Sequence, residues 1–242
     1  PSAASAAVPY RRRHLATAPA LWKMLSQGYK RIFEGGGSMY PDDVDICNCG
    51  LDLEAAGNGA AWKDPLAMLQ ALGLEEGSLS WRMQRHGAAL YWHMATTSGE
   101  DAGGDLNLLR DRDVLEVACM RGGGARYLCD VLGPRRYVAT DVEDEHLELC
   151  RQSKSPPCLE FANANASKLA EFFEADSFDV VLCVQSIAVF ADPRGFILQA
   201  AQVLRPGGHL LVCDLVTPES LQEVLAAIRD AGLSTSAVHD PP

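Results

Sequence analysis

The sequence predicts an α/β protein built on a doubly wound parallel β-sheet, with a helical N-terminal extension. From Arg112 onward, short apolar segments alternate with segments that have helical periodicity. The apolar segments are continuous, which is typical of parallel strands that helices cover on both faces. Five such segments occur with helices between them, and this alternation is the pattern of a doubly wound fold.

Each element of this region can be placed from its own pattern. The expected strands are residues 113–119, 136–141, 158–163, 178–184 and 209–215. The expected helices are residues 122–133, 143–152, 166–175, 193–204 and 218–232. Residues 234–242 leave room for one more short strand, so the sheet edge beyond the fifth strand needs a cover. We expect a partner chain, or this chain's own N-terminal region, to pair with that edge.

The chain divides into two parts by composition. Residues 61–242 are expected to form the α/β domain, with a helical lead-in over 61–110 and the sheet core over 111–242. Residues 1–60 contain a basic arm, an amphipathic helix around residues 21–32 and a glycine-rich linker, and are expected to pack little against the sheet. Residues 1–20 have the Ala, Ser and Arg content of an organellar transit peptide, which predicts a mitochondrial location; a chloroplast, or a solvated arm in the cytoplasm, is the alternative.

The charge is unevenly distributed. The net charge of the chain is −11. All charged side chains before Glu34 are basic and give this part a charge of +6, so the remainder of the chain carries −17. An acidic body of this kind repels phosphate backbones, so we expect no nucleic-acid partner. No apolar run reaches the roughly 18 residues of a transmembrane helix.

The cysteines predict neither disulfides nor a metal site. Six of the eight fall in apolar or helical segments, where a free thiol packs as a small hydrophobe, and this favours a reducing compartment. Cys47 and Cys49 form a CxC pair, but no second Cys/His pair with zinc spacing follows.

A glycine cluster and an acidic residue occupy the positions where such sheets bind ligands. The first strand leads from Glu116 into Gly122–Gly124, and the second strand ends at Asp141. A carboxylate at that position can accept both ribose hydroxyls of a nucleoside. Two alternatives remain: the glycines can serve only the turn into the helix, and Asp141 can be a surface residue at the start of the next helix.

At this point the sequence resembles the class I S-adenosylmethionine-dependent methyltransferases, and within them the phthiotriol and related lipid methyltransferases. The segments that carry the resemblance are VLEVACMRGGGARYL, YVATD, LEFANANASKL, FDVVLCVQSIAVFADP and LRPGGHLLVCDL, within residues 85–232. The resemblance implies a Rossmann-like methyltransferase fold and S-adenosylmethionine as cofactor. The cofactor-binding positions that it implies are Glu116, Ala118, Gly122, Asp141, Asn165 and Gln185.

Three departures from the family pattern bear on activity. The family has glycine at three alternating loop positions, where this chain has Ala118, Met120 and Gly122. Met120 is expected to point into the space of the cofactor's methionine moiety. Asn165 replaces an acidic residue, and the segment from Gln185 to Ala188 holds no histidine or carboxylate to act as a general base.

These departures lead to two hypotheses about function. The first is a pseudoenzyme: an accessory or assembly subunit, part of a mitochondrial complex, that binds protein partners through its N-terminal arm and its C-terminal sheet edge. The alternative is an active S-adenosylmethionine-dependent methyltransferase with a small-molecule acceptor, in which proximity and orientation supply most of the catalysis.

Overall fold

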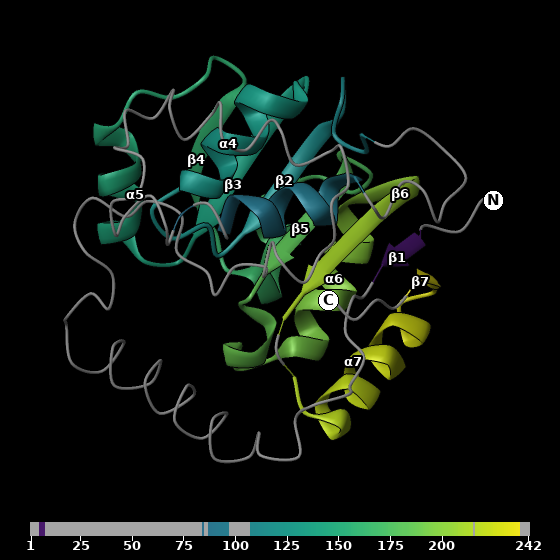
Figure 1. Cartoon of the computed structure of the whole chain (residues 1–242). Coiled ribbons are helices and arrows are strands. Elements are labelled where there is room, and N and C mark those ends of the chain that lie inside the picture. Colours follow the sequence, from purple (N-terminus) through teal and green to yellow (C-terminus); the bar gives the residue numbers. More distant parts are fainter. Residues whose placement is uncertain (1–4, 8–83, 85–86, 97–106, 215, 238–242) are drawn as a thin grey trace.

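The computed structural model describes residues 5–7, 84, 87–96, 107–214 and 216–237 (Figure 1). These residues confirm the doubly wound parallel sheet. Its strand order is β4-β3-β2-β5-β6-β1-β7, and every strand pair is parallel. The strands are β1 (Ser5–Ala7), β2 (Asp113–Val117), β3 (Arg136–Asp141), β4 (Leu159–Asn163), β5 (Phe178–Val184), β6 (Leu204–Cys213) and β7 (Ser234–Ala237).

Helices cover both faces of the sheet. The α-helices are α4 (Gly123–Leu132), α5 (Asp144–Gln152), α6 (Pro193–Val203) and α7 (Pro218–Asp230), and the 3-10 helices are η2 (Ala166–Glu171) and η3 (Ile187–Val189). The helical residues 87–96, α4 and α5 form one hydrophobic core with the sheet, and the 3-10 helices form the other with α6 and α7. Successive strand residues alternate between the two cores: Val114 of β2 lies in the first and Leu115 in the second.

The N-terminus enters the sheet, which corrects one expectation. β1 pairs in parallel with β6 on one side and with β7 on the other. The expectation that residues 1–60 pack little against the sheet is therefore wrong for Ser5–Ala7, and the chain's own N-terminal region covers the edge of β6. The basic helix around residues 21–32, the CxC pair and the linker lie outside the described residues.

Two elements differ from their sequence-based boundaries. Residues 166–175 were expected to be a helix, but only Ala166–Glu171 are helical, and Lys168 has a non-helical φ of −142°. Phe173 instead packs edge-on against Phe178 of β5, with ring centroids 5.2 Å apart. β6 begins at Leu204 rather than at residue 209, because the chain pairs with Phe178 before a register shift.

The described residues contain six cysteines, all of them free thiols, and five are buried. None of the helices among these residues has the length and apolar character needed to cross a membrane. Likewise, no group of three or more His, Cys, Asp or Glu side chains in this part of the chain could hold a metal ion.

Candidate functional site

The loop between β2 and α4 has three alternating residues in the left-handed backbone region. The φ angle is +55° at Ala118, +49° at Met120 and +70° at Gly122. A residue other than glycine costs about 1–2 kcal/mol in this conformation. The backbone therefore follows the course of a glycine-rich turn even where Ala118 and Met120 replace glycine.

Two glycines at the start of α4 have packing roles within the protein. A Cβ atom on Gly122 would lie 2.6 Å from the Phe161 ring, and one on Gly124 would lie 2.1 Å from the Tyr91 ring. Both positions thus require glycine for close packing, whether or not a ligand binds. The alternative that these glycines serve the turn is consistent with this geometry.

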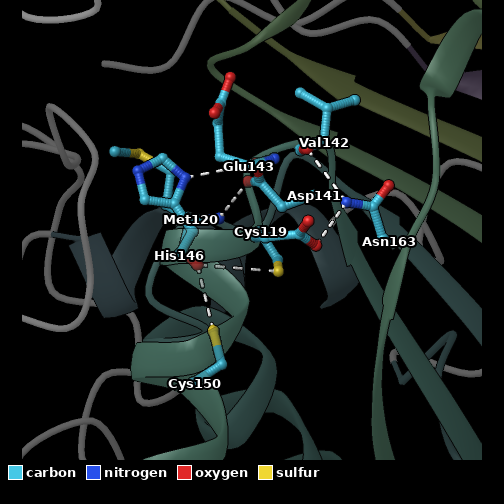
Figure 2. A network of polar contacts seen from close by, with 9 residues as sticks. Cys119, Met120, Asp141, Val142, Glu143, His146, Cys150 and Asn163 are labelled. Carbon is cyan, nitrogen blue, oxygen red and sulfur yellow. Dashed lines mark hydrogen bonds and ion pairs between the residues drawn. The ribbon is translucent and has the colours of Figure 1, made fainter.

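Asp141 is buried at the end of β3, so it is not a surface residue as one alternative held. Its side chain is only 5% exposed. The carboxylate accepts the backbone N–H of Met120 at 2.9 Å and that of Glu143 at 3.0 Å, and it contacts Nδ1 of His146 at 3.3 Å (Figure 2). The structure therefore joins the carboxylate of β3 directly to the left-handed loop after β2.

His146 belongs to this site, although the sequence suggested only a surface residue. It lies in the first turn of α5, and its side chain is 23% exposed. The hydrogen bond to Asp141 raises the pKa of His146 above its usual 6.5, against the opposing effect of burial. The spacing from Asp141 could have indicated this pair, because five residues carry the chain from a strand end to the first turn of the next helix.

Glu116 is buried beneath the loop and is held by two tyrosines. The Tyr91 hydroxyl donates to Oε1 at 2.6 Å, and the Tyr137 hydroxyl donates to Oε2 at 2.9 Å. Burial raises the pKa of Glu116 to about 7, although both hydrogen bonds act in the opposite direction. The carboxyl group therefore faces the two tyrosines, and its role in shaping a cofactor pocket stays a prediction.

Two buried thiols fix the backbone of Met120 from the other side. Cys150 of α5 donates to the Met120 carbonyl at 3.1 Å, and the Cys119 thiol lies 4.0 Å from the same oxygen (Figure 2). The hydrogen bond with Cys150, together with burial, raises the pKa of Cys119. A raised pKa disfavours the thiolate form of Cys119, so this thiol acts as a packing group.

Asn165 and Gln185 lie at the same edge of the sheet, because the carboxyl ends of β4, β3, β2 and β5 are neighbours. Asn165 is exposed, and its Oδ1 caps η2 by accepting the Ser167 N–H at 2.9 Å. Gln185 follows β5 with a φ of +51°. The cofactor contacts implied for these two residues remain predictions.

Asp214 is a candidate that the sequence analysis missed. It follows β6, and its Oδ2 accepts the backbone N–H of Ala188 at 3.0 Å. A carboxylate therefore lies beside the loop after β5, although residues 185–188 of that loop contain none. Asp214 could have been found from its position at the end of β6, the strand that neighbours β5 in the sheet.

Comparisons with known proteins agree with this architecture. Residues 115–212 match a family model described as a methyltransferase domain. The α/β domain of this chain is thus similar, in sequence and in fold, to class I S-adenosylmethionine-dependent methyltransferases. The crystal structure of the [4+2]-cyclase SpnF has a TM-score of 0.51 and 20% identity, covering 65% of this chain and 60% of that one. This structural likeness concerns the fold alone.

Two curated relatives are similar in sequence. A probable phthiotriol/phenolphthiotriol dimycocerosates methyltransferase 2 of Mycobacterium ulcerans is 38% identical over 52% of this chain and 48% of its own length. A fatty-acid O-methyltransferase of Mycolicibacterium smegmatis is 36% identical over 50% of this chain and 43% of its own length. The match thus spans less than half of each relative. Their names favour the enzyme alternative over the accessory-subunit hypothesis.

Proposed function

We propose that this chain provides the cofactor-binding domain of an S-adenosylmethionine-dependent methyltransferase that acts on a small apolar molecule. The observation that carries the proposal is the hydrogen bond between Asp141 at the end of β3 and the backbone of Met120 in the left-handed loop after β2. This contact supports the proposal because the strand-end carboxylate and the turn after the first strand are the two places where doubly wound sheets bind nucleosides.

The residues at this edge fit such a cofactor in charge and in backbone course. An ionised carboxylate has about four acceptor positions, and three are used at Asp141, so one position on Oδ2 remains for a ribose hydroxyl. Asn165 uses its Oδ1 in a cap, but this oxygen has a second lone pair for an adenine amino group. The left-handed backbone at Ala118 and Gly122 matches a loop that lies against the methionine part.

When bound, S-adenosylmethionine supplies a methyl group that its sulfonium has already activated. The protein must then hold the acceptor in line and exclude water. Val142 and Val189, which follow β3 and β5, are 53% and 47% exposed. Exposed valines at this edge favour an apolar acceptor, in keeping with the lipid names of the two relatives.

The acceptor's own ionisation decides whether a base is needed. A carboxylic acid is already ionised at neutral pH, so its oxygen can attack without a general base. An alcohol needs a general base, and Asp214, which accepts a hydrogen bond from the backbone N–H of Ala188 in the loop after β5, is the candidate for it. The loop from Gln185 to Ala188 contains no titratable side chain, which supports an acceptor that is already ionised.

The test is a calorimetric titration with S-adenosylhomocysteine, followed by transfer of a labelled methyl group to fatty acids and to the matching fatty alcohols. Micromolar binding that Asp141→Ala weakens by at least tenfold, with labelling of the acids, would support the proposal. Failure of S-adenosylhomocysteine to bind would reject it and favour the accessory-subunit hypothesis.

A further inference from the structure

The Asp141 carboxylate makes more internal contacts than a free nucleoside-binding group needs. Its Oδ1 accepts the Glu143 N–H at 3.0 Å and contacts His146 Nδ1 at 3.3 Å, whereas Oδ2 accepts the Met120 N–H at 2.9 Å. Both acceptor positions of Oδ1 are therefore occupied, and one position remains on Oδ2. A ribose presents two adjacent hydroxyls, so one of them has no acceptor unless an internal donor leaves.

His146 is the donor that can leave. The other two donors are backbone amides, and they are fixed by the loop after β2 and by the turn into α5. The His146 contact is the longest of the three, and its side chain is 23% exposed. Figure 2 shows the second ring nitrogen of His146 turned away from Asp141, so Asp141 is the partner that the ring gives up when it rotates.

We propose that His146 competes with the ligand's ribose for Oδ1 of Asp141, so that ligand binding displaces His146 and releases its proton. This inference rests on the proposed function. It makes His146 a positioning residue, because it acts on the ligand through Asp141.

The direction of the pH dependence follows from the charges around His146. Asp141 on β3 and Glu143 before α5 favour its protonated form, whereas Arg121 in the loop after β2 opposes it. Loss of the Asp141 contact therefore lowers the pKa of His146. Binding is then coupled to proton release, and affinity rises as pH rises through the pKa of the free protein. A pKa decrease of one unit on binding corresponds to about a tenfold change in affinity.

The experiment is calorimetric titration with S-adenosylhomocysteine between pH 5.5 and 8.5, in buffers of different ionisation enthalpy. We expect wild type to bind several-fold more tightly at high pH and to release protons. His146→Gln, which cannot be protonated, should lose both effects, and His146→Leu should bind at low pH as tightly as wild type does at high pH. An analogue that lacks the ribose 2′-hydroxyl needs only the remaining position on Oδ2, so its affinity should depend less on pH.

A second titrating group requires a control, because Glu116 has a pKa of about 7. Glu116→Gln should keep the pH dependence of binding if His146 causes it. The same pH profile in wild type and His146→Gln, with binding intact, would overturn the inference and leave the proposed function standing. Absence of binding at every pH would overturn both. Without ligand, the NMR titration of His146 should shift to lower pH in Asp141→Asn, and an unchanged titration would also contradict the inference.

Discussion

The largely buried carboxylates at the two ends of the sheet have different interaction partners. At the amino end, Asp113 and Asp179 each pair with both Arg135 and Arg205, and three of the four N–O distances lie between 2.7 and 2.9 Å. At the carboxyl end, hydroxyls, backbone amides and one histidine contact the carboxylates of Glu116 and Asp141. Arginines thus neutralise the carboxylates at the first end, whereas no arginine or lysine pairs with Glu116 or Asp141 among the described contacts at the second.

This difference in pairing also distinguishes the two ends of the sheet as places for a ligand. The paired charges at the amino end leave little net electrostatic potential to attract a charged ligand. The loop after β2, whose left-handed backbone follows a glycine-rich turn, lies at the carboxyl end. Left-handed residues other than glycine occur at both ends: Ala118, Met120 and Gln185 follow strands, whereas Asp111 and Asp176 precede them. Aspartate tolerates this conformation better than the other three, so the greater strain lies at the carboxyl end. Strain of this kind persists where surrounding structure holds it, and it concentrates at functional sites. The carboxyl end therefore combines the greater backbone strain with the site proposed above.

The first prediction concerns Glu116, whose titration should have the largest effect. Its pKa is about 7 in the folded protein and near 4.5 in a free chain, so the folded state binds the proton more tightly. The stability from this group is full below pH 4.5 and is lost as pH rises to 7, by about 3 kcal/mol. Urea denaturation between pH 4.5 and 8 should show this loss in wild type and a flatter profile in Glu116→Gln.

The control for this titration is Glu160→Gln, which removes a carboxyl that is 63% exposed on β4. This variant has the same change in charge without the burial. Parallel profiles for wild type and Glu116→Gln would contradict the prediction, since they would show that the buried carboxyl does not titrate in this range.

The comparison also shows which features could be predicted from sequence. β2 to β6 and Asp141 follow from patterns of neighbouring residues, because an apolar run and its terminal carboxylate are local. The Tyr91–Glu116 contact joins residues 25 positions apart, and no local pattern encodes it. Ser5–Ala7 is three residues long and forms a strand only because β6 and β7 leave a space between them, which is a property of the tertiary structure.

Asp113 provides the opposite pH dependence at the amino end. The hydrogen bond from Arg135 lowers the pKa of Asp113, despite the opposing effect of burial. A lowered pKa contributes stability above the usual value near 3.8, and this stability is lost as pH falls through the folded value. Asp113→Asn should cost about 1–2 kcal/mol at pH 7, because the arginine partners are partly exposed to water.

Denaturation of Asp113→Asn at pH 7 and pH 3 measures this effect. The difference from wild type should shrink on acidification, whereas that of Glu116→Gln should grow on going from acid to neutral pH. If Asp113→Asn shows an equal difference at both values, its cost would come from packing rather than from charge, and the contrast between the two ends would lose its electrostatic basis.

The smallest expected change in stability belongs to Met120→Gly, but this variant tests the ligand site most directly. Glycine removes about 1–2 kcal/mol of left-handed strain and adds roughly 0.5–1 kcal/mol of unfolded-chain entropy, so the net gain in stability should lie between about 0 and 1.5 kcal/mol. The matched control is Ala118→Gly, because Ala118 has a similar φ of +55° and only a methyl side chain.

If the Met120 side chain narrows the pocket, only Met120→Gly should tighten binding of S-adenosylhomocysteine, by fivefold or more. Equal tightening in both variants would assign the effect to backbone strain. Unchanged affinity in both would show that the left-handed loop accepts the cofactor with methionine in place.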